Sequence, residues 1–214
     1  MQMNGMPHMI EQERILDDMR MKSMKKEEII RFLKDNVEPL EDIAYGNGYR
    51  ASVQLVDGVF LPCVIFRDPK TIVDLAIRRL KEERFNRELT SIFVAKGNCV
   101  NDHDIASIDI SKYAFPLSVL KQVRGETTMS WTAFAAKMKD GKHYGFGTTF
   151  LIDFFQMPEG YAVEDIVEII NHTYVLKNGE LRPHGTFPTI LSDEKNGAVI
   201  YRERPYFECF IDGL

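Results

Sequence analysis

Two stretches of this sequence place an Asp-Gly pair between runs in which apolar residues alternate. The first pair is Asp57-Gly58 and the second is Asp140-Gly141. Because glycine tolerates a positive φ and the flanking residues alternate between two faces, each pair predicts a β-hairpin with a two-residue turn. Asn178-Gly179 predicts a third turn of this kind. We therefore expect an antiparallel β-sheet built from Asp-Gly and Asn-Gly hairpins.

A helical pattern follows each of the first two hairpins. Pro69 can occupy the first turn of a helix whose apolar stripe runs to about residue 85, and Pro158 can open a helix that ends at residue 172. The ranges 49–86 and 131–172 are therefore two candidate hairpin-helix (ββα) units. The predicted fold class is α+β, with the antiparallel sheet flanked by helices. Identity between the two ranges is thin, so a duplication is only one of two explanations.

Residues 23–214 are expected to form a single α+β domain. Ser23 can cap a helix that Pro39 stops. Residues 1–22 are expected to be an N-terminal extension, for which two interpretations stand: a mobile segment that the domain does not need, or a short helix that docks through its apolar stripe.

Composition and charge exclude several classes of protein. The chain has 214 residues, 44% of them hydrophobic, as in an ordinary globular protein. Its formal charge of -5 argues against broad nucleic-acid binding and against anionic membranes, since both need a basic face. No segment is predicted to be a signal peptide or a membrane span, so we expect a cytoplasmic protein.

The three cysteines are far apart and form no CxxC pair, so neither a disulfide framework nor a cysteine-based zinc site is predicted. Cys63 and Cys209 lie on apolar strand faces and are expected to be buried. The densest cluster of potential metal ligands is Asp102, His103 and Asp104. Because Asn and Asp also favour turns, a turn is the preferred interpretation, and no metal or cofactor is predicted.

Gly145 and Gly147 lie in "HYGFGTT". They sit inside a predicted strand, not between a strand and a helix, so they do not indicate a phosphate loop. A bulge, or a close approach of another backbone, is the better explanation, and such an approach could form the floor of a cleft. For an enzyme with a site between the two units, the candidate catalytic residues are His103, Asp104, His143 and Tyr144.

Aromatic residues and arginines gather near the end of the chain, a mixture that is enriched at binding hot spots. These candidate partner-binding residues are Tyr201, Arg202, Arg204 and Tyr206. No common catalytic motif occurs, so whether the chain is an enzyme stays open. The preferred hypothesis is a non-enzymatic cytoplasmic protein that binds a protein partner, as an inhibitor, immunity-type or adaptor protein. The alternative is a small enzyme or ligand-binding protein, and a homo-oligomer formed through an edge strand is compatible with both.

Overall fold

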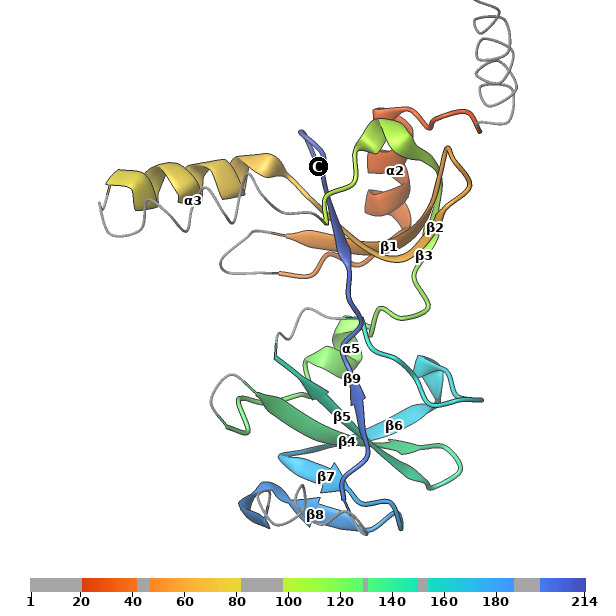
Figure 1. Ribbon diagram of the computed structural model, residues 1–214, viewed down its shortest axis with the longest axis vertical. Helices are drawn as coiled ribbons and strands as arrows, with labels where there is room; N and C mark the ends of the chain where they lie inside the picture. Colours follow the sequence, from red (N-terminus) through yellow and green to blue (C-terminus); the bar gives the residue numbers. More distant parts are fainter. Residues whose placement is uncertain (1–20, 42–46, 82–97, 129–130, 150–153, 187–196) are drawn as a thin grey trace, which may run out of the picture. The chain divides into compact units, whose positions relative to one another are not determined.

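The computed structural model describes residues 21–41, 47–81, 98–128, 131–149, 154–186 and 197–214 (Figure 1). These residues form ten β-strands and three α-helices, joined by short 3-10 turns. The expected α+β composition is therefore confirmed in its coarse form.

Contacts along the chain divide it into two compact units, where the sequence was expected to form one domain over 23–214. Unit 1 comprises Met1–Val37, Ala44–Ile110 and Phe207–Leu214, and unit 2 comprises Glu38–Ile43 and Ser111–Tyr206. Unit 2 is thus inserted into the sequence of unit 1. Each unit has its own four-stranded sheet and its own hydrophobic core.

The sheet of unit 1 is centred on the first Asp-Gly hairpin, in the strand order β10-β2-β1-β3. The hairpin strands β1 and β2 form as predicted. β3 runs antiparallel to β1, whereas β10 runs parallel to β2. The strand bounds are β1 Gly48–Leu55, β2 Phe60–Arg67, β3 Ile105–Ile110 and β10 Phe207–Phe210.

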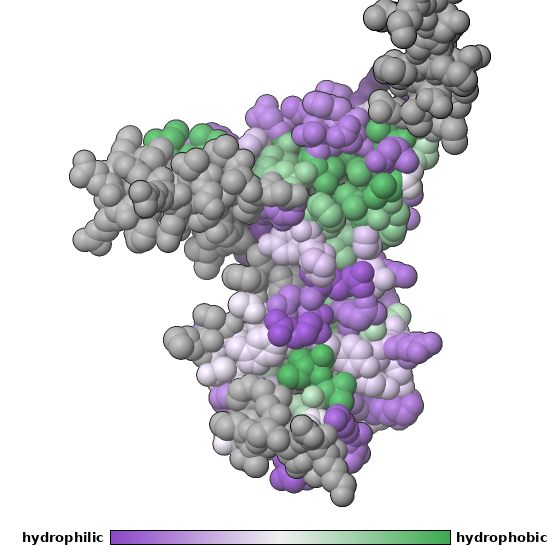
Figure 2. Space-filling view, viewed as in Figure 1, coloured by the Kyte–Doolittle hydropathy of each residue, from purple (hydrophilic) through white to green (hydrophobic). Residues whose placement is uncertain are grey.

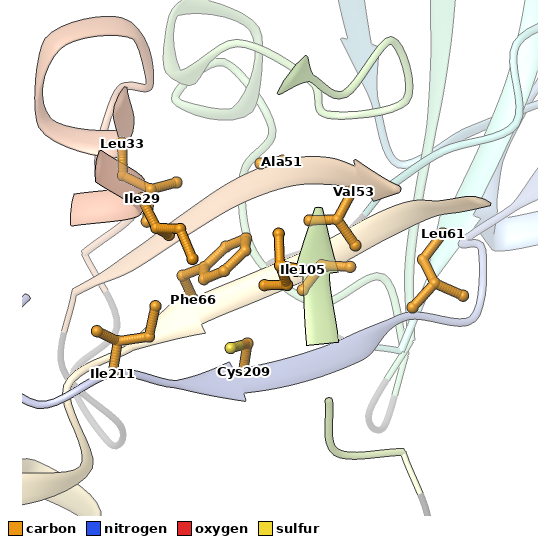
Figure 3. Packing of buried hydrophobic residues seen from close by; sticks show 10 residues of the cluster. Ile29, Leu33, Ala51, Val53, Leu61, Phe66, Ile105, Cys209 and Ile211 are labelled. Atoms are coloured by element: carbon orange, nitrogen blue, oxygen red, sulfur yellow. The ribbon is translucent and has the colours of Figure 1, made fainter. Parts of the chain in front are cut away.

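Helix α2 (Lys26–Asn36) covers one face of this sheet. Its buried residues Ile29 and Leu33 lie one turn apart and face Phe66 of β2 (Figure 3). Glu28, not Ser23, satisfies the start of the helix, because its carboxylate accepts a hydrogen bond from the Lys25 N–H at 2.9 Å. The second helix, α3 (Pro69–Lys81), begins at the predicted proline.

The sheet of unit 2 is centred on the second Asp-Gly hairpin, in the order β6-β4-β5-β9. The predicted Asn-Gly hairpin also forms, as the separate pair β7 and β8. A short helix, α5 (Leu117–Leu120), packs against the core of this unit. The strand bounds are β4 Thr132–Met138, β5 His143–Thr148, β6 Ile166–Asn171, β7 Thr173–Val175, β8 Leu181–Pro183 and β9 Ile200–Arg202.

The helix predicted over 158–172 is wrong. Val163–Asp165 forms one 3-10 turn, and Ile166–Asn171 forms strand β6 beside β4. The apolar residues Ile166, Ile169 and Ile170 fit a helical stripe, but a run this short cannot decide between helix and strand. The β-branched side chains and the open edge of β4 decide for the strand.

The two sheets nevertheless repeat one topology. Each has a central Asp-Gly hairpin, a third strand antiparallel to the first, and a late strand parallel to the second. The strand pairs β1·β3 and β4·β6 also carry a register shift at the same place, before Leu55 and before Met138. The repeated element is therefore a hairpin with two flanking strands, not the expected ββα unit, and the sheets are mixed instead of purely antiparallel.

Backbone hydrogen bonds around the two turns match one for one. The Leu55 N–H donates to the Val59 carbonyl at 2.8 Å, and the Met138 N–H donates to the Lys142 carbonyl at 2.8 Å. The two turn aspartates also accept equivalent hydrogen bonds. Asp57 accepts one from the Val59 N–H at 3.0 Å, and Asp140 accepts one from the Lys142 N–H at 3.1 Å. Position 59 of unit 1 thus corresponds to position 142 of unit 2.

Among the described residues, no helix has the length and apolarity that a membrane span requires.

Candidate functional site

A pocket of about 410 Å³ opens on unit 2. Three segments line it: the second Asp-Gly turn with the start of β5, the end of β7 with the turn that follows it, and the chain from Val199 into β9. The lining residues are Gly141, Lys142, His143, Tyr144, Gly145, Val175, Leu176, Lys177, Gly179, Val199 and Tyr201.

The pocket depends on a close approach of backbones at Gly145. A Cβ on this residue would lie 2.7 Å from the Val199 carbonyl oxygen. The Val199 N–H also donates to the Val175 carbonyl at 2.9 Å, which ties two walls of the pocket together. Of the two interpretations that the sequence left open for this glycine, a bulge or a close backbone approach, the close approach is observed.

Gly147, the other glycine of the pair, makes room for the side chain of Trp131. A Cβ there would lie 2.2 Å from the indole ring of Trp131, so only glycine lets the ring rest on the sheet. Neither glycine precedes a helix, and both lie within β5. The rejection of a phosphate loop at this motif therefore agrees with the structure.

A hydrogen-bonded network fixes the cation at the rim of the pocket. The Tyr161 hydroxyl donates to Asp140 Oδ2 at 2.6 Å, and Lys142 Nζ lies 3.1 Å from the same hydroxyl and 3.3 Å from Asp140 Oδ2. The hydrogen bond from Tyr161 lowers the pKa of Asp140. In turn, Asp140 raises the pKa of Tyr161 to about 12. Lys142 is thus a positioned ammonium group.

Tyrosine rings stand next to this network. The rings of Tyr144 and Tyr161 are 5.0 Å apart, and those of Tyr144 and Tyr201 are 5.9 Å apart. Both distances are typical of favourable aromatic pairs. His143 and Tyr144, two of the predicted catalytic candidates, therefore meet the predicted partner-binding residue Tyr201 at one pocket.

The other predicted partner-binding residues make contacts within unit 2. The Arg202 guanidinium lies 4.5 Å from the centre of the Trp131 ring and pairs with Glu203 at 2.9 Å. The Arg204 guanidinium lies 4.1 Å from the centre of the Tyr113 ring. Tyr206 packs against Phe154, with ring centres 6.3 Å apart. Of the four residues, Tyr201 alone lines the pocket.

The cluster Asp102, His103 and Asp104 forms a 3-10 turn in unit 1, which agrees with the preferred interpretation. The His103 side chain is 85% exposed, and its Nδ1 lies 3.0 Å from Asp102 Oδ1. No group of three or more His, Cys, Asp or Glu side chains in the described residues is arranged to hold a metal ion. His103 and Asp104 belong to unit 1, whereas His143 and Tyr144 belong to unit 2.

The burial predicted for Cys63 and Cys209 is confirmed. Cys63 and Cys209 are buried, and Cys99 is exposed. Burial raises the pKa of the Cys209 thiol to about 12. Because the thiolate is the reactive form, Cys209 is a packing residue.

Lys142, Lys177 and Tyr161 were not predicted as site residues. Lys142 follows the turn glycine in "DGK", and Lys177 precedes the Asn-Gly turn in "KNG". At either place a lysine is an ordinary polar residue of a turn. Tyr161 was assigned to the helix that does not form. The recurrence of a lysine at two predicted turns was the only available signal.

No family model, no curated protein and no solved structure matches this chain. Its function must therefore be inferred from the geometry of the pocket.

Proposed function

We propose that the protein binds another protein in the cytoplasm, as an inhibitor, immunity-type or adaptor protein, and that the pocket of unit 2 is part of its binding surface. The observation that carries this proposal is the lining of the pocket, which combines tyrosines with fixed and exposed cations. Concave sites with aromatic anchors and a few polar groups are where binding energy concentrates.

The chain beyond the pocket supports the same function. Arg202 follows Tyr201 directly, and its side chain stays 58% exposed although it stacks on Trp131. An arginine that is already held by an aromatic ring loses less conformational freedom when a partner binds. The segment 201–204 therefore offers preorganised contacts.

A second candidate function is small-molecule binding or catalysis in the same pocket. It is favoured by His143 and Tyr144, which line the pocket together, and by a pocket volume within the range of ligand sites. Native mass spectrometry of the gently purified protein separates the two functions. A co-purifying polypeptide supports partner binding, whereas a small mass increment supports the second candidate.

Site-specific photocrosslinking tests the proposed function. Val199 lines the pocket and is 41% exposed, so the photoreactive residue p-benzoylphenylalanine can replace it without removing a cation. Val167 is a matched control, because it is another exposed valine of unit 2 and does not line the pocket. We expect a discrete crosslinked polypeptide from position 199 and none from position 167. Equal crosslinking at both positions, or none at either, would contradict the proposal.

The same experiment reports on self-association. A crosslinked product of twice the chain mass would identify a second copy of the protein as the partner. Such a homo-oligomer is compatible with either function.

A further inference from the structure

The pocket is lined by basic residues, although the whole chain has a net negative charge. The whole sequence has 32 acidic and 27 basic residues. Among the described residues that line the pocket, Lys142, Lys177 and His143 are basic, and none is an aspartate or a glutamate. The nearest carboxylate in the network at the rim, Asp140, offsets part of the Lys142 charge at 3.3 Å. A cationic hollow in an acidic protein suits a negatively charged ligand group.

The repeated topology supplies an internal comparison. The two turns have the same pattern of hydrogen bonds. Val59 and Phe60 of unit 1 therefore correspond in position to Lys142 and His143 of unit 2. Both unit 1 residues are exposed, at 47% and 56%. Figure 2 shows hydrophobic residues gathered on the visible face of this unit. The hairpin frame therefore does not require a cation after its turn glycine.

The network leaves Lys142 able to bind a ligand. An ammonium group has three hydrogens, and the two contacts to Tyr161 and Asp140 engage two of them. The third can donate to a ligand oxygen. Because both contacts hold the side chain in one place, little conformational freedom remains to be lost on binding.

The pocket also offers apolar surface. Val175, Leu176 and Val199 are among its lining residues. At about 410 Å³ the hollow is as large as a site for a small organic molecule, so it can take more than a single anionic group. A peptide in which acidic and apolar side chains alternate could contact both the basic and the apolar residues of the lining.

We propose that this pocket recognises an acidic segment of the partner protein, with a carboxylate at Lys142 and Lys177 and a neighbouring apolar side chain at Val199. This inference rests on the proposed function, because it names the chemistry of the partner at the same site.

The test is an NMR titration of the isotopically labelled full-length protein with the synthetic peptide acetyl-Glu-Leu-Glu-amide. We expect saturable shifts of the amides of 142–145 and 177–179. Lys177→Gln should weaken binding about threefold, which is the effect expected of one exposed charge pair. Lys121→Gln should leave binding unchanged, because Lys121 is an exposed lysine of unit 2 outside the pocket lining.

A second variant changes the charge in the opposite direction. Asp140→Asn keeps an oxygen for the Lys142 N–H but removes the negative charge beside the ammonium group. We expect this variant to bind the peptide more tightly than the wild type. Unchanged or weaker binding would count against the inference.

Two control ligands decide the chemical class. No response to acetyl-Glu-Leu-Glu-amide, an equal response to acetyl-Lys-Leu-Lys-amide, or an equal or stronger response to inorganic phosphate would overturn the inference. A polypeptide crosslinked at position 199 through a basic segment would also overturn it while leaving the proposed function intact. The absence of any crosslinked partner would overturn the proposed function itself.

Discussion

A Cβ on Gly145 would lie 2.7 Å from the carbonyl oxygen of Val199. The wall of the pocket that Val199 forms can approach β5 this closely only because residue 145 has no side chain. A backbone carbonyl cannot move aside as easily as the end of a long side chain. The contact therefore fixes the position of the chain that enters β9.

We therefore expect Gly145→Ala to destabilise the protein by about 1 to 3 kcal/mol, the usual cost of overpacking a tight contact. Urea unfolding followed by circular dichroism measures this free energy of unfolding. Gly185→Ala is the control, because a Cβ there meets no atom of the described residues within 4 Å. Equal stability of the two variants would show that the approach of Val199 to β5 is not tight.

The two Asp-Gly turns should respond alike to substitution. Gly58 and Gly141 have φ of +89° and +88°, and in the part of the chain that the structure describes a Cβ at either meets nothing within 4 Å. Alanine at either position therefore suffers only the backbone strain of the left-handed region, about 1 to 2 kcal/mol. Unfolding free energies of Gly58→Ala and Gly141→Ala should fall together. A large loss in one variant and none in the other would contradict the repeated hairpin frame.

The network at the pocket rim predicts that the pKa of Asp140 depends on Tyr161. Tyr161→Phe removes the hydrogen bond that lowers the pKa of Asp140, so this pKa should rise toward its usual value. A lowered pKa means that the folded state favours the carboxylate. The contribution of Asp140 to stability is therefore present above its usual pKa, near 4, and is lost as the pH falls. The carboxyl ¹³C shift of Asp140, followed across this acid range in both proteins, gives the two pKa values. Identical values would remove Tyr161 from the network.

Thiol reactivity should separate the three cysteines. Cys99 is exposed, whereas Cys63 and Cys209 are buried and the pKa of Cys209 is raised to about 12. A chromogenic disulfide reagent should therefore label one thiol quickly in the native protein and all three after denaturation. Rapid labelling of a Cys99→Ser variant would mean that a second thiol is accessible.

Local chemistry made much of the fold predictable from the sequence. The three turns with a glycine at their second position, the helix start at Pro69 and the burial of Cys63 each follow from a single residue type in a clear pattern. The segment 166–171 was not predictable, because its isoleucines fit both periodicities and the edge of β4 selects the strand. β9 pairs in parallel with β5, and β10 pairs in parallel with β2. Both pairings join residues far apart in the sequence, and no local pattern signals them.

The site was predictable only in pieces. His143, Tyr144 and Tyr201 were each singled out, but on different grounds and for different functions. The sequence contains no sign that the turn at Asn178-Gly179 lies beside β5, so Lys177 could not be joined to Lys142. The pocket depends on tertiary contacts that only the folded chain reveals.

We expect the protein partner to bind at the cations of this pocket, Lys142 and Lys177. The most direct measurement is the dissociation constant, by isothermal titration calorimetry, of the complex with the polypeptide that crosslinks at position 199. Lys142→Gln/Lys177→Gln should weaken the complex about tenfold, since two exposed charge pairs together are worth on the order of 1 to 2 kcal/mol. The charge-matched control Lys112→Gln/Lys121→Gln, at two exposed lysines outside the pocket lining, should bind like the wild type. Wild-type affinity in the pocket variant would contradict the claim.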